Sequence, residues 1–505
     1  MRALLSVWDK RGLVELARGL GGLDCELVAS GGTSAALRDA GIPHVEVAEL
    51  TGSPEMLSGR VKTLHPSIHG GILADLDDPA HVADLAAAGI TPIDLVVCNL
   101  YPFRADPSIG LIDVGGPTMV RAAAKNHAHV GIVVDPDDYD LVLNELRASG
   151  RLDDATRARL ARKAFAHTAA YDAAIVAWFD RDVVRSEGLP ESLHLTLERA
   201  EALRYGENPH QRGARYRLEG VSSCWDTARQ HAGVALSYLN LFDADAAWRL
   251  AHELRDDAGA PAAVLVKHAN ACGAAVATSV AEAFRRALAC DELSAFGGVF
   301  ALAGELDEPV AEAIAAGPQA DVVIAAGLTD GARELLVARR KATRLLTADA
   351  PGPPVLSVRT IGDTVLVQDP DDFVRAPASW EVATTRAPTP DELGDLVIAW
   401  RVCGRTSSNA IVLANDGAAV GIGAGQQSRV AAAELAVARA RDRAKGAVAA
   451  SDAFFPFADG LEALVDAGVT AVVQPGGSIR DAEIVAAADA AGLAMLLTGE
   501  RHFRH

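Results

Sequence analysis

Short apolar runs alternate with helical patterns from the first residues of this chain onward, and no other feature restricts its fold so strongly. The run at residues 95–98 contains no polar position, which is typical of a strand that helices cover on both faces. Where helical patterns separate such strands, the strands pair in parallel. The sequence therefore predicts an α/β fold with a parallel sheet in its N-terminal half. The expected strands are residues 4–7, 26–29, 95–98 and 130–134, and the first expected helices are residues 12–20 and 33–40.

The chain has 505 residues, more than one hydrophobic core usually holds, because domains commonly run to roughly 100–200 residues. From residue 154 to about 180 the pattern becomes one long alanine-rich helix or a broken pair of helices, and a polar stretch follows at 181–191. We therefore expect a boundary near 185–200, with one domain at 1–190 and a second at 195–505.

The second half has strands of its own, and two stretches rich in Pro, Gly or Thr interrupt them at 347–355 and 376–390. These stretches predict two subdomains joined near 350–390. A weak repeat, in which an Asn is followed by a strand and then by a Gly-rich return, occurs around Asn270 and again around Asn409. It leaves open whether this half arose by duplication. The expected strands are residues 263–266, 322–325, 365–367, 411–414 and 471–473.

The charge balance argues against a nucleic-acid partner. The net charge is −20, and such a surface repels a phosphate backbone, although a small anionic substrate needs only a local basic pocket. The six cysteines form no C-x-x-C pair, which is typical of reduced thiols in a cytosolic protein. The start does not read as a signal peptide, and no apolar stretch reaches the ~20 residues that span a bilayer. We therefore expect a cytoplasmic protein without a membrane partner.

Two loops of the N-terminal half carry groups suited to an anion. Residues 30–34 follow an expected strand and open an expected helix, so their backbone N–H groups and hydroxyls can hold a phosphate. A plain turn capped by Thr33 explains them equally well. Residues 59–66 bring Arg60 and Lys62 into a segment without helical or strand period. A solvated basic loop is the alternative, although such loops beside a parallel sheet are frequent anion sites.

Two further loops carry candidate acid–base groups. One directly follows the strand expected at 95–98 and carries Tyr101; the other carries Asp113 and leads into a helix with Lys125. Ligands of an open parallel sheet bind beyond the carboxyl ends of its strands, so these loops can converge with residues 30–34. Lys, Tyr and Asp together suit general acid–base chemistry. Singly, each is more often structural, as a surface charge, a packed aromatic ring or a helix cap.

Taken together, residues 60–66, 99–103, 112–118 and 121–127 resemble the IMP cyclohydrolase domain of a family of bifunctional purine biosynthesis enzymes. That domain has a methylglyoxal-synthase-like fold and closes the ring of FAICAR to IMP by dehydration. The resemblance implies a catalytic group of Lys62, Tyr101, Asp113 and Lys125, in which Lys125 donates or accepts a proton. The implied nucleotide site is lined by Asp9, Lys10, Ser30, Gly31, Gly32, Thr33, Arg60, Thr63, Asn99 and Val114.

The C-terminal half carries a dense polar stretch and a strand that ends in two basic residues. Residues 203–211 have almost no apolar filler, and Arg204 beside Tyr205 can hold a phosphate and stack on a base. Further on, a buried strand runs straight into Lys267 and His268. Strand ends place side chains accurately, and a neutral His is the natural base near pH 7. A surface Lys and a His that caps the strand are the equally weighted alternative.

Residues 294–298, 407–410, 421–429, 451–457, 474–478 and 501–505 complete a resemblance to the AICAR transformylase domain of the same family. It implies a duplicated cytidine-deaminase-like α/β fold, and with the first match it covers nearly the whole chain. It also implies that His268 deprotonates the 5-amino group of AICAR, that Lys267 stabilises charge on the formyl oxygen of 10-formyltetrahydrofolate, and that Asn409 orients that group. The implied binding residues are Arg204, Tyr205, Gly297, Asp321, Arg429, Phe454, Asp459, Ser478, Ile479 and Arg501.

The resemblance thus implies a bifunctional enzyme for the last two steps of IMP synthesis. AICAR gives FAICAR with 10-formyltetrahydrofolate as co-substrate, FAICAR then closes to IMP, and no catalytic metal takes part. The family's transformylase sites lie at a subunit interface, which implies a homodimer. Three positions depart from the family pattern: Trp8 and Ala271 stand where Ser and Pro are usual, and Ser407 where Lys or Gln sometimes stands. Trp8 is therefore left out of the expected site.

The sequence supports two other function classes less well, a zinc deaminase and a nucleotide sensor. A zinc deaminase needs an H-x-E motif and a P-C-x-x-C pair, whereas Ala269 and Asn270 follow His268 and no C-x-x-C occurs. A nucleotide sensor without activity is disfavoured because Lys125, Lys267 and His268 are all present.

Overall fold

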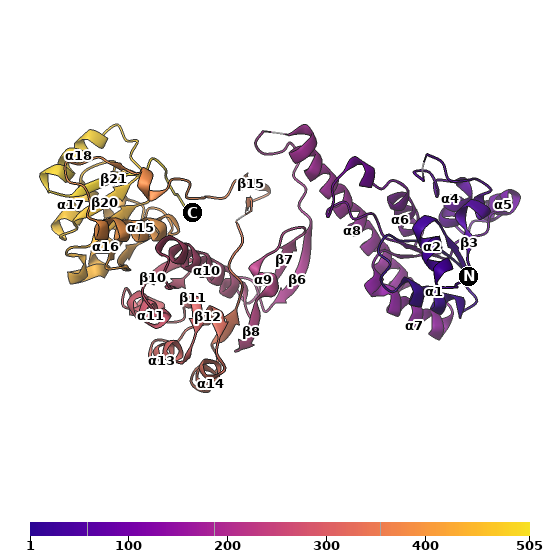
Figure 1. Cartoon of the computed structure of the whole chain (residues 1–505), viewed down its shortest axis with the longest axis horizontal. Helices are drawn as coiled ribbons and strands as arrows, with labels where there is room; N and C mark the ends of the chain where they lie inside the picture. The colour runs from indigo at the N-terminus through magenta and orange to yellow at the C-terminus, as the bar shows by residue number, and fades with distance from the viewer. Residues whose placement is uncertain (58, 186, 354) are drawn as a thin grey trace. The chain divides into compact units, whose positions relative to one another are not determined.

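The structure is a computed structural model that describes residues 1–57, 59–185, 187–353 and 355–505. Its contacts divide the chain into two units, Met1–Thr196 and Leu197–His505 (Figure 1). In the described residues, no helix is both long enough and apolar enough to span a bilayer.

The first unit is a parallel sheet with helices on both faces. Its strands are β1 (Arg2–Ser6), β2 (Glu26–Ala29), β3 (Val45–Glu46), β4 (Leu95–Cys98) and β5 (Gly131–Val133). Its helices are α1 (Leu13–Gly21), α2 (Gly31–Asp39), α3 (Val47–Thr51), α4 (Pro66–Leu73), α5 (Pro79–Ala88), α6 (Gly115–Lys125), α7 (Tyr139–Ser149) and α8 (Asp154–Trp178). The strand order of this part of the described chain is β3-β2-β1-β4-β5, and every pair is parallel.

Alternating side chains of these strands feed two separate cores. Leu4 and Val96 pack on one face, under α4, α6 and α8, whereas Leu5 and Val97 pack on the other, under α1, α2 and α7 (Figure 1). The expected parallel sheet is therefore present, with strand ends shifted by one or two residues. The alternative left open for 154–180 is decided as well, because α8 is one continuous helix.

The second unit is built on a mixed sheet. Its strands are β6 (Leu197–Leu203), β7 (Gly213–Leu218), β8 (Arg229–Ala232), β9 (Ala262–Lys267), β10 (Asn270–Val276), β11 (Val299–Leu306), β12 (Val322–Leu328), β13 (Arg344–Thr347), β14 (Ser357–Ile361), β15 (Thr364–Gln368), β16 (Glu381–Val382), β17 (Ile411–Asn415), β18 (Ala418–Gly423), β19 (Val448–Ser451), β20 (Ala471–Gln474) and β21 (Ala494–Leu497). Its helices are α9 (Cys224–Thr227), α10 (Tyr238–Ala258), α11 (Val280–Leu288), α12 (Glu292–Ala295), α13 (Glu308–Ala316), α14 (Asp330–Arg339), α15 (Pro390–Gly404), α16 (Arg429–Ala440), α17 (Asp459–Asp466) and α18 (Asp481–Ala490).

One sheet runs through this whole unit. Among the described residues it has twelve strands in the order β16-β21-β20-β19-β17-β18-β10-β9-β11-β12-β13-β8. Helices α10 and α15 cover one face, and the other face is covered by α11, α13 and α14 in one half and by α16, α17 and α18 in the other. The strand expected at 365–367 is β15, which pairs with β14 in a separate hairpin.

The order of elements repeats within the second unit. In each half a helix, a hairpin, a helix and three further strands alternating with helices follow one another, beginning with α10 and with α15. The two hairpins, β9–β10 and β17–β18, meet in an antiparallel pair at the centre of the sheet. The asparagine echo read from the sequence is not this repeat, because Asn270 begins β10 whereas Asn409 precedes β17.

Candidate active sites

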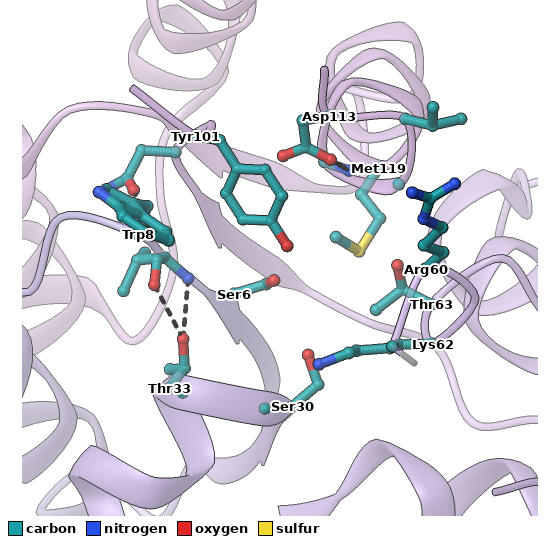
Figure 2. Close-up of a pocket in the computed structure, with 18 of the residues that line it drawn as sticks. Ser6, Trp8, Ser30, Thr33, Arg60, Lys62, Thr63, Tyr101, Asp113 and Met119 are labelled. Atoms are coloured by element: carbon teal, nitrogen blue, oxygen red, sulfur yellow. Dashed lines mark hydrogen bonds between the residues drawn. The ribbon is translucent and has the colours of Figure 1, made fainter. Parts of the chain in front are cut away.

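The first unit has a cavity of about 780 Å³ beyond the carboxyl ends of β1, β2 and β4 (Figure 2). That is the edge at which open parallel sheets bind ligands, and its size is typical of a small-molecule site. The expected residues that line it are Lys10, Ser30, Gly31, Gly32, Thr33, Arg60, Lys62, Thr63, Asn99, Tyr101, Asp113 and Val114. Trp8 also lines the cavity, so leaving it out of the expected site was wrong. The other lining residues are Ser6, Val7, Gly59, Ile109, Gly110, Ile112, Gly115, Gly116 and Met119.

Two helices and several cations favour an anion in this cavity. Helices α2 and α6 begin at its wall, at Gly31 and Gly115, and helix N-termini offer N–H groups and a positive partial charge. Lys62 lies against Gly31, because a Cβ placed on Gly31 would be 2.7 Å from Lys62 Nζ. Figure 2 shows the Lys62 ammonium beside the Ser30 side chain. A side chain at position 31 would therefore displace the Lys62 ammonium from its present place.

Two of the expected ligand residues are held by backbone groups of the loop after β1. Asn99 Oδ1 accepts the N–H groups of Trp8 and Asp9 at 2.6 and 2.9 Å. The buried Thr33 hydroxyl accepts the Val7 N–H at 2.9 Å and donates to the Val7 carbonyl at 3.1 Å. Thr33 therefore does not cap α2, whose N-cap residue is Ser30. Both side chains shape the cavity by joining neighbouring strand ends.

Asp113 is the carboxylate of the cavity, and Tyr101 faces it (Figure 2). Burial raises the pKa of Asp113, and hydrogen bonds from the backbone N–H groups of Gly116 and Tyr101 oppose that rise. A carboxyl group with a raised pKa is suited to exchange a proton nearer neutral pH. The Tyr101 ring is 38% exposed and packs edge-on against Trp8, with ring centroids 5.3 Å apart.

Tyr171 positions the loop that carries Asp113, a role the sequence did not indicate. Its hydroxyl accepts the Asp113 N–H at 2.9 Å and donates to the Leu111 carbonyl at 2.7 Å. Tyr171 lies on α8, 58 residues from Asp113. No local pattern links the two, because the contact depends on how α8 packs on the sheet.

Two expected residues are not among those that line this cavity. Asp9 turns to Arg11, with an ion pair of 2.7 Å. The hydrogen bond that the Arg11 backbone N–H donates to Asp9, together with the Arg11 guanidinium, lowers the pKa of Asp9. Lys125 is the last residue of α6, whose first residue Gly115 lines the cavity. A helix of this length spans roughly 16 Å, and the Lys125 side chain is exposed. Its catalytic role stays a prediction.

In the second unit, strand directions bring most of the expected residues to one edge of the large sheet. Strands β9, β19, β20 and β21 end at this edge, and β10, β11, β12 and β17 begin there. The residues at or just beyond these strand ends are Lys267, His268, Gly297, Asp321, Asn409, Phe454, Ser478, Ile479 and Arg501. Together these residues span more than 230 positions of the sequence, from Lys267 to Arg501 (501 − 267 = 234).

Lys267 and His268 open into a cavity of about 240 Å³ that Asn270, Asp291, Ser294 and Arg439 also line. The Lys267 ammonium donates to the Phe296 carbonyl at 2.8 Å, which ties the end of β9 to the loop before β11. The His268 side chain is exposed. Both groups therefore project from the sheet edge and are accessible to a substrate.

Asn409 belongs to a buried polar network beside this pair. Arg429 donates to Asn409 Oδ1 at 2.8 Å and to the fully buried carboxylate of Asp452. The Ser407 N–H donates to Asn270 Oδ1 at 2.7 Å, so this network is joined to the turn that carries His268. Because Arg429 and Asp452 neutralise each other, the network fixes Asn409 without an unpaired buried charge.

The remaining expected residues surround the same edge. The Arg204 guanidinium lies 5.3 Å from the Tyr205 ring centroid, and the Arg501 guanidinium 4.3 Å from that of Phe503. Of the rest, Gly297 has a φ of 73°, Asp321 and Phe454 are exposed, and Ile479 is fully exposed. Asp459 Oδ1 accepts the Gly460 N–H, and the Ser478 N–H donates to Asp481 Oδ2.

Comparison with known proteins identifies the family of this chain. A family model described as AICARFT/IMPCHase bienzyme matches residues 123–439, and one described as MGS-like domain matches residues 12–128. The bifunctional purine biosynthesis protein PurH of Cereibacter sphaeroides is 50% identical over 100% of this chain and 98% of that protein. The chain belongs to the AICARFT/IMPCHase bienzyme family.

Other relatives extend the comparison. PurH of Dinoroseobacter shibae is 48% identical over 100% of this chain and 98% of that protein. A solved structure titled "Crystal structure of ForH" is 44% identical, covers 35% of this chain and 98% of that chain, and aligns with a TM-score of 0.33.

Membership in the bienzyme family confirms three expectations from the sequence. The fold class is an MGS-like α/β domain with a parallel sheet followed by the bienzyme's mixed α/β domain. The chain is a bifunctional enzyme of purine biosynthesis with AICAR transformylase and IMP cyclohydrolase activities. In this family the transformylase uses a formyl-folate as co-substrate.

Proposed function

We propose that the two activities are divided between the two units. The unit at 1–190 closes FAICAR to IMP in the cavity of Lys62, Tyr101 and Asp113, and the unit at 195–505 transfers the formyl group at Lys267 and His268. The observation that carries this proposal is the first cavity, where two helix N-termini and the three cations Lys10, Arg60 and Lys62 meet a partly buried carboxyl group and a tyrosine. The helix N-termini and the cations can bind a nucleotide phosphate. The carboxyl group and the tyrosine can transfer the protons that ring closure with loss of water requires.

Ring closure requires proton transfers at three atoms of FAICAR. The carboxamide nitrogen attacks the formyl carbon and loses a proton, while the formyl oxygen takes one up and becomes a hydroxyl. This hydroxyl accepts a second proton and leaves as water, and the formamide nitrogen loses its N–H proton as the C=N bond forms. Asp113 accepts the first proton, helped by the rise of its pKa on burial. Tyr101, Lys62 and Lys125 are proposed to supply the second and to stabilise the oxygen that carries the developing charge. The loops with Ser30 and Arg60 hold the phosphate.

Formyl transfer begins with the 5-amino nitrogen of AICAR attacking the formyl carbon of 10-formyltetrahydrofolate. His268 takes the proton from this nitrogen, and Lys267 stabilises the negative charge on the formyl oxygen. The bond from the formyl carbon to N10 then breaks, N10 takes up a proton, and tetrahydrofolate leaves. Asn409, held by Arg429, orients the formyl group.

The substrates of the second unit are held along its sheet edge. We assign the nucleotide and folate contacts to the residues that the sequence indicated, Arg204, Tyr205, Gly297, Asp321, Arg429, Phe454, Asp459, Ser478, Ile479 and Arg501. Neither reaction step requires a metal, because each proton and charge has a protein group to receive it. All six cysteines, which lie in the described part of the chain, are free; this supports a reducing, cytoplasmic location.

A second copy of this chain is the proposed partner. The β14–β15 hairpin forms its own sheet and leaves Val358, Ile361, Val365 and Leu366 between 45% and 55% exposed. A two-stranded hairpin is marginal by itself and exposed apolar groups favour an interface, so we infer a homodimer. Sedimentation analysis tests it: a monomer at micromolar concentration contradicts the inference.

Two variants test the division of labour. His268→Ala should abolish formyl transfer from 10-formyltetrahydrofolate to AICAR and leave closure of supplied FAICAR intact, because the cyclohydrolase cavity lies in the other unit. Lys125→Ala should do the reverse. Lys341→Ala, which removes an exposed lysine outside both sites, is the matched control. Loss of both activities in either variant contradicts separate sites, and unchanged ring closure in Lys125→Ala removes that lysine from the mechanism.

A further inference from the structure

Lys267 and His268 lie where β9 turns back into β10 through only two residues. These residues, His268 and Ala269, have φ values of 53° and 56°. A two-residue hairpin turn with positive φ at both positions favours Asn-Gly or Asp-Gly there. His and Ala disfavour this region, because their Cβ approaches the following carbonyl oxygen too closely. The conformation of the turn therefore has to be stabilised by groups outside it.

Asp243 on α10 supplies that stabilisation. Its Oδ2 accepts the His268 N–H at 3.1 Å, and its Oδ1 accepts the Ala269 N–H at 2.8 Å. One carboxylate thus binds both central amides of the turn. Asp243 is half-buried, and although burial raises its pKa, these two amide bonds act in the opposite direction and favour the charged carboxylate.

The other half of the unit contains the same arrangement. Asp395 on α15 accepts the Asp416 N–H at 2.8 Å and the Gly417 N–H at 2.7 Å. Asp243 and Asp395 both lie six positions after the N-cap residues of their helices, which are residue 237 (243 − 237 = 6) and residue 389 (395 − 389 = 6). The contact is therefore a repeated element of the duplicated fold.

The two copies differ in the sequence and in the place of the turn. Asp416–Gly417 has an Asp-Gly sequence that suits positive φ without help, and strand directions put it at the opposite edge of the sheet from Lys267. His268–Ala269 does not suit it, and this turn presents the proposed base to the cavity. The first copy thus has a role that the second copy lacks.

We propose that Asp243 is a positioning residue for formyl transfer, whose carboxylate fixes the turn that presents Lys267 and His268 to AICAR. This inference rests on the roles of Lys267 and His268 in the proposed function. Without the carboxylate, the turn relaxes toward the backbone conformation that Ala269 prefers, and the imidazole leaves its place. Asp243 itself touches no substrate.

The test compares Asp243→Asn with Asp395→Asn in the full-length enzyme. Each amide keeps the size of the side chain, but it accepts only through its oxygen and points an NH₂ group at the second backbone N–H. The double variant D243N/A269G adds a residue that adopts positive φ freely. The measurements are kcat and KM for AICAR, closure of supplied FAICAR, and the melting temperature, with His268→Ala run alongside.

We expect D243N to lower kcat for formyl transfer about 10- to 100-fold with little change in KM, since misplacing a catalytic group by about 1 Å has such an effect. D395N should destabilise the protein to a similar extent but keep this kcat. Ala269→Gly should recover about threefold or more in the D243N background. FAICAR closure should be unchanged in all variants.

Three results overturn the inference: D243N with kcat within about twofold of the wild type, D395N with an equal loss, or a double variant that recovers nothing. A fully active His268→Ala enzyme refutes the assignment of His268 instead. An inactive His268→Ala enzyme beside a fully active D243N enzyme refutes only the role of Asp243.

Discussion

Tyr171→Phe removes a single hydroxyl that joins α8 to the loop of Asp113. The hydroxyl makes two hydrogen bonds, to the Leu111 carbonyl at 2.7 Å and from the Asp113 N–H at 2.9 Å, and Tyr171 is only 8% exposed. A hydrogen bond of this kind contributes about 1 kcal/mol net, so the two together predict a loss of about 2 kcal/mol. For a unit of this size the melting temperature should fall by roughly 4–8 °C.

The same change should slow ring closure. With its N–H unpaired, Asp113 shifts relative to Tyr101, and a displacement of about 1 Å lowers kcat by on the order of 100-fold. The assay follows IMP formation from supplied FAICAR, with formyl transfer by the other unit as an internal reference. Tyr139→Phe is the matched control, because the buried Tyr139 hydroxyl has no hydrogen-bond partner in the described residues. Ring closure at the wild-type rate in Tyr171→Phe would falsify the argument.

Two further substitutions test the phosphate-binding part of the first cavity, at Gly31 and Lys62, and a buried histidine, His252. Gly31→Ala puts a Cβ 2.7 Å from Lys62 Nζ on a backbone with φ of 51°, so IMP affinity measured by calorimetry should fall about tenfold, equal to 1.4 kcal/mol; unchanged affinity contradicts the close approach of Lys62. Burial lowers the pKa of His252 to about 4, and its ring nitrogens have no hydrogen-bond partner among the described residues. Because the unfolded chain takes up this proton below about pH 6.5 and the folded chain only near pH 4, the free energy of unfolding should fall between these values by about 3 kcal/mol. His252→Leu should flatten this fall in chemical denaturation measured from pH 7 to 4, and an unchanged slope rejects the assignment.

Local sequence was sufficient for the elements and for the loops that carry chemistry. Apolar runs such as 95–98 are strands because nothing polar interrupts a segment covered on both faces. Loops after such strands meet at one edge of a parallel sheet, so Ser30, Tyr101 and Asp113 could be expected together, and the structure places all three around one cavity. Lys125 shows the limit of this reasoning. A residue close in sequence to a cavity residue can still lie on another side of the helix, or too far along it to reach the cavity.

The sequence by itself determined the α/β class, the order of the two domains and the family, and it indicated the residues that we propose as chemically active. Only the tertiary structure decided which distant groups hold them in place. Tyr171 reaches Asp113 because α8 packs on the first sheet, and Asp243 reaches His268 because α10 packs beneath the β9–β10 turn. Strand pairing and helix packing depend on the whole core rather than on local pattern. For this reason no motif near Lys267 and His268 indicated the carboxylate that binds their turn.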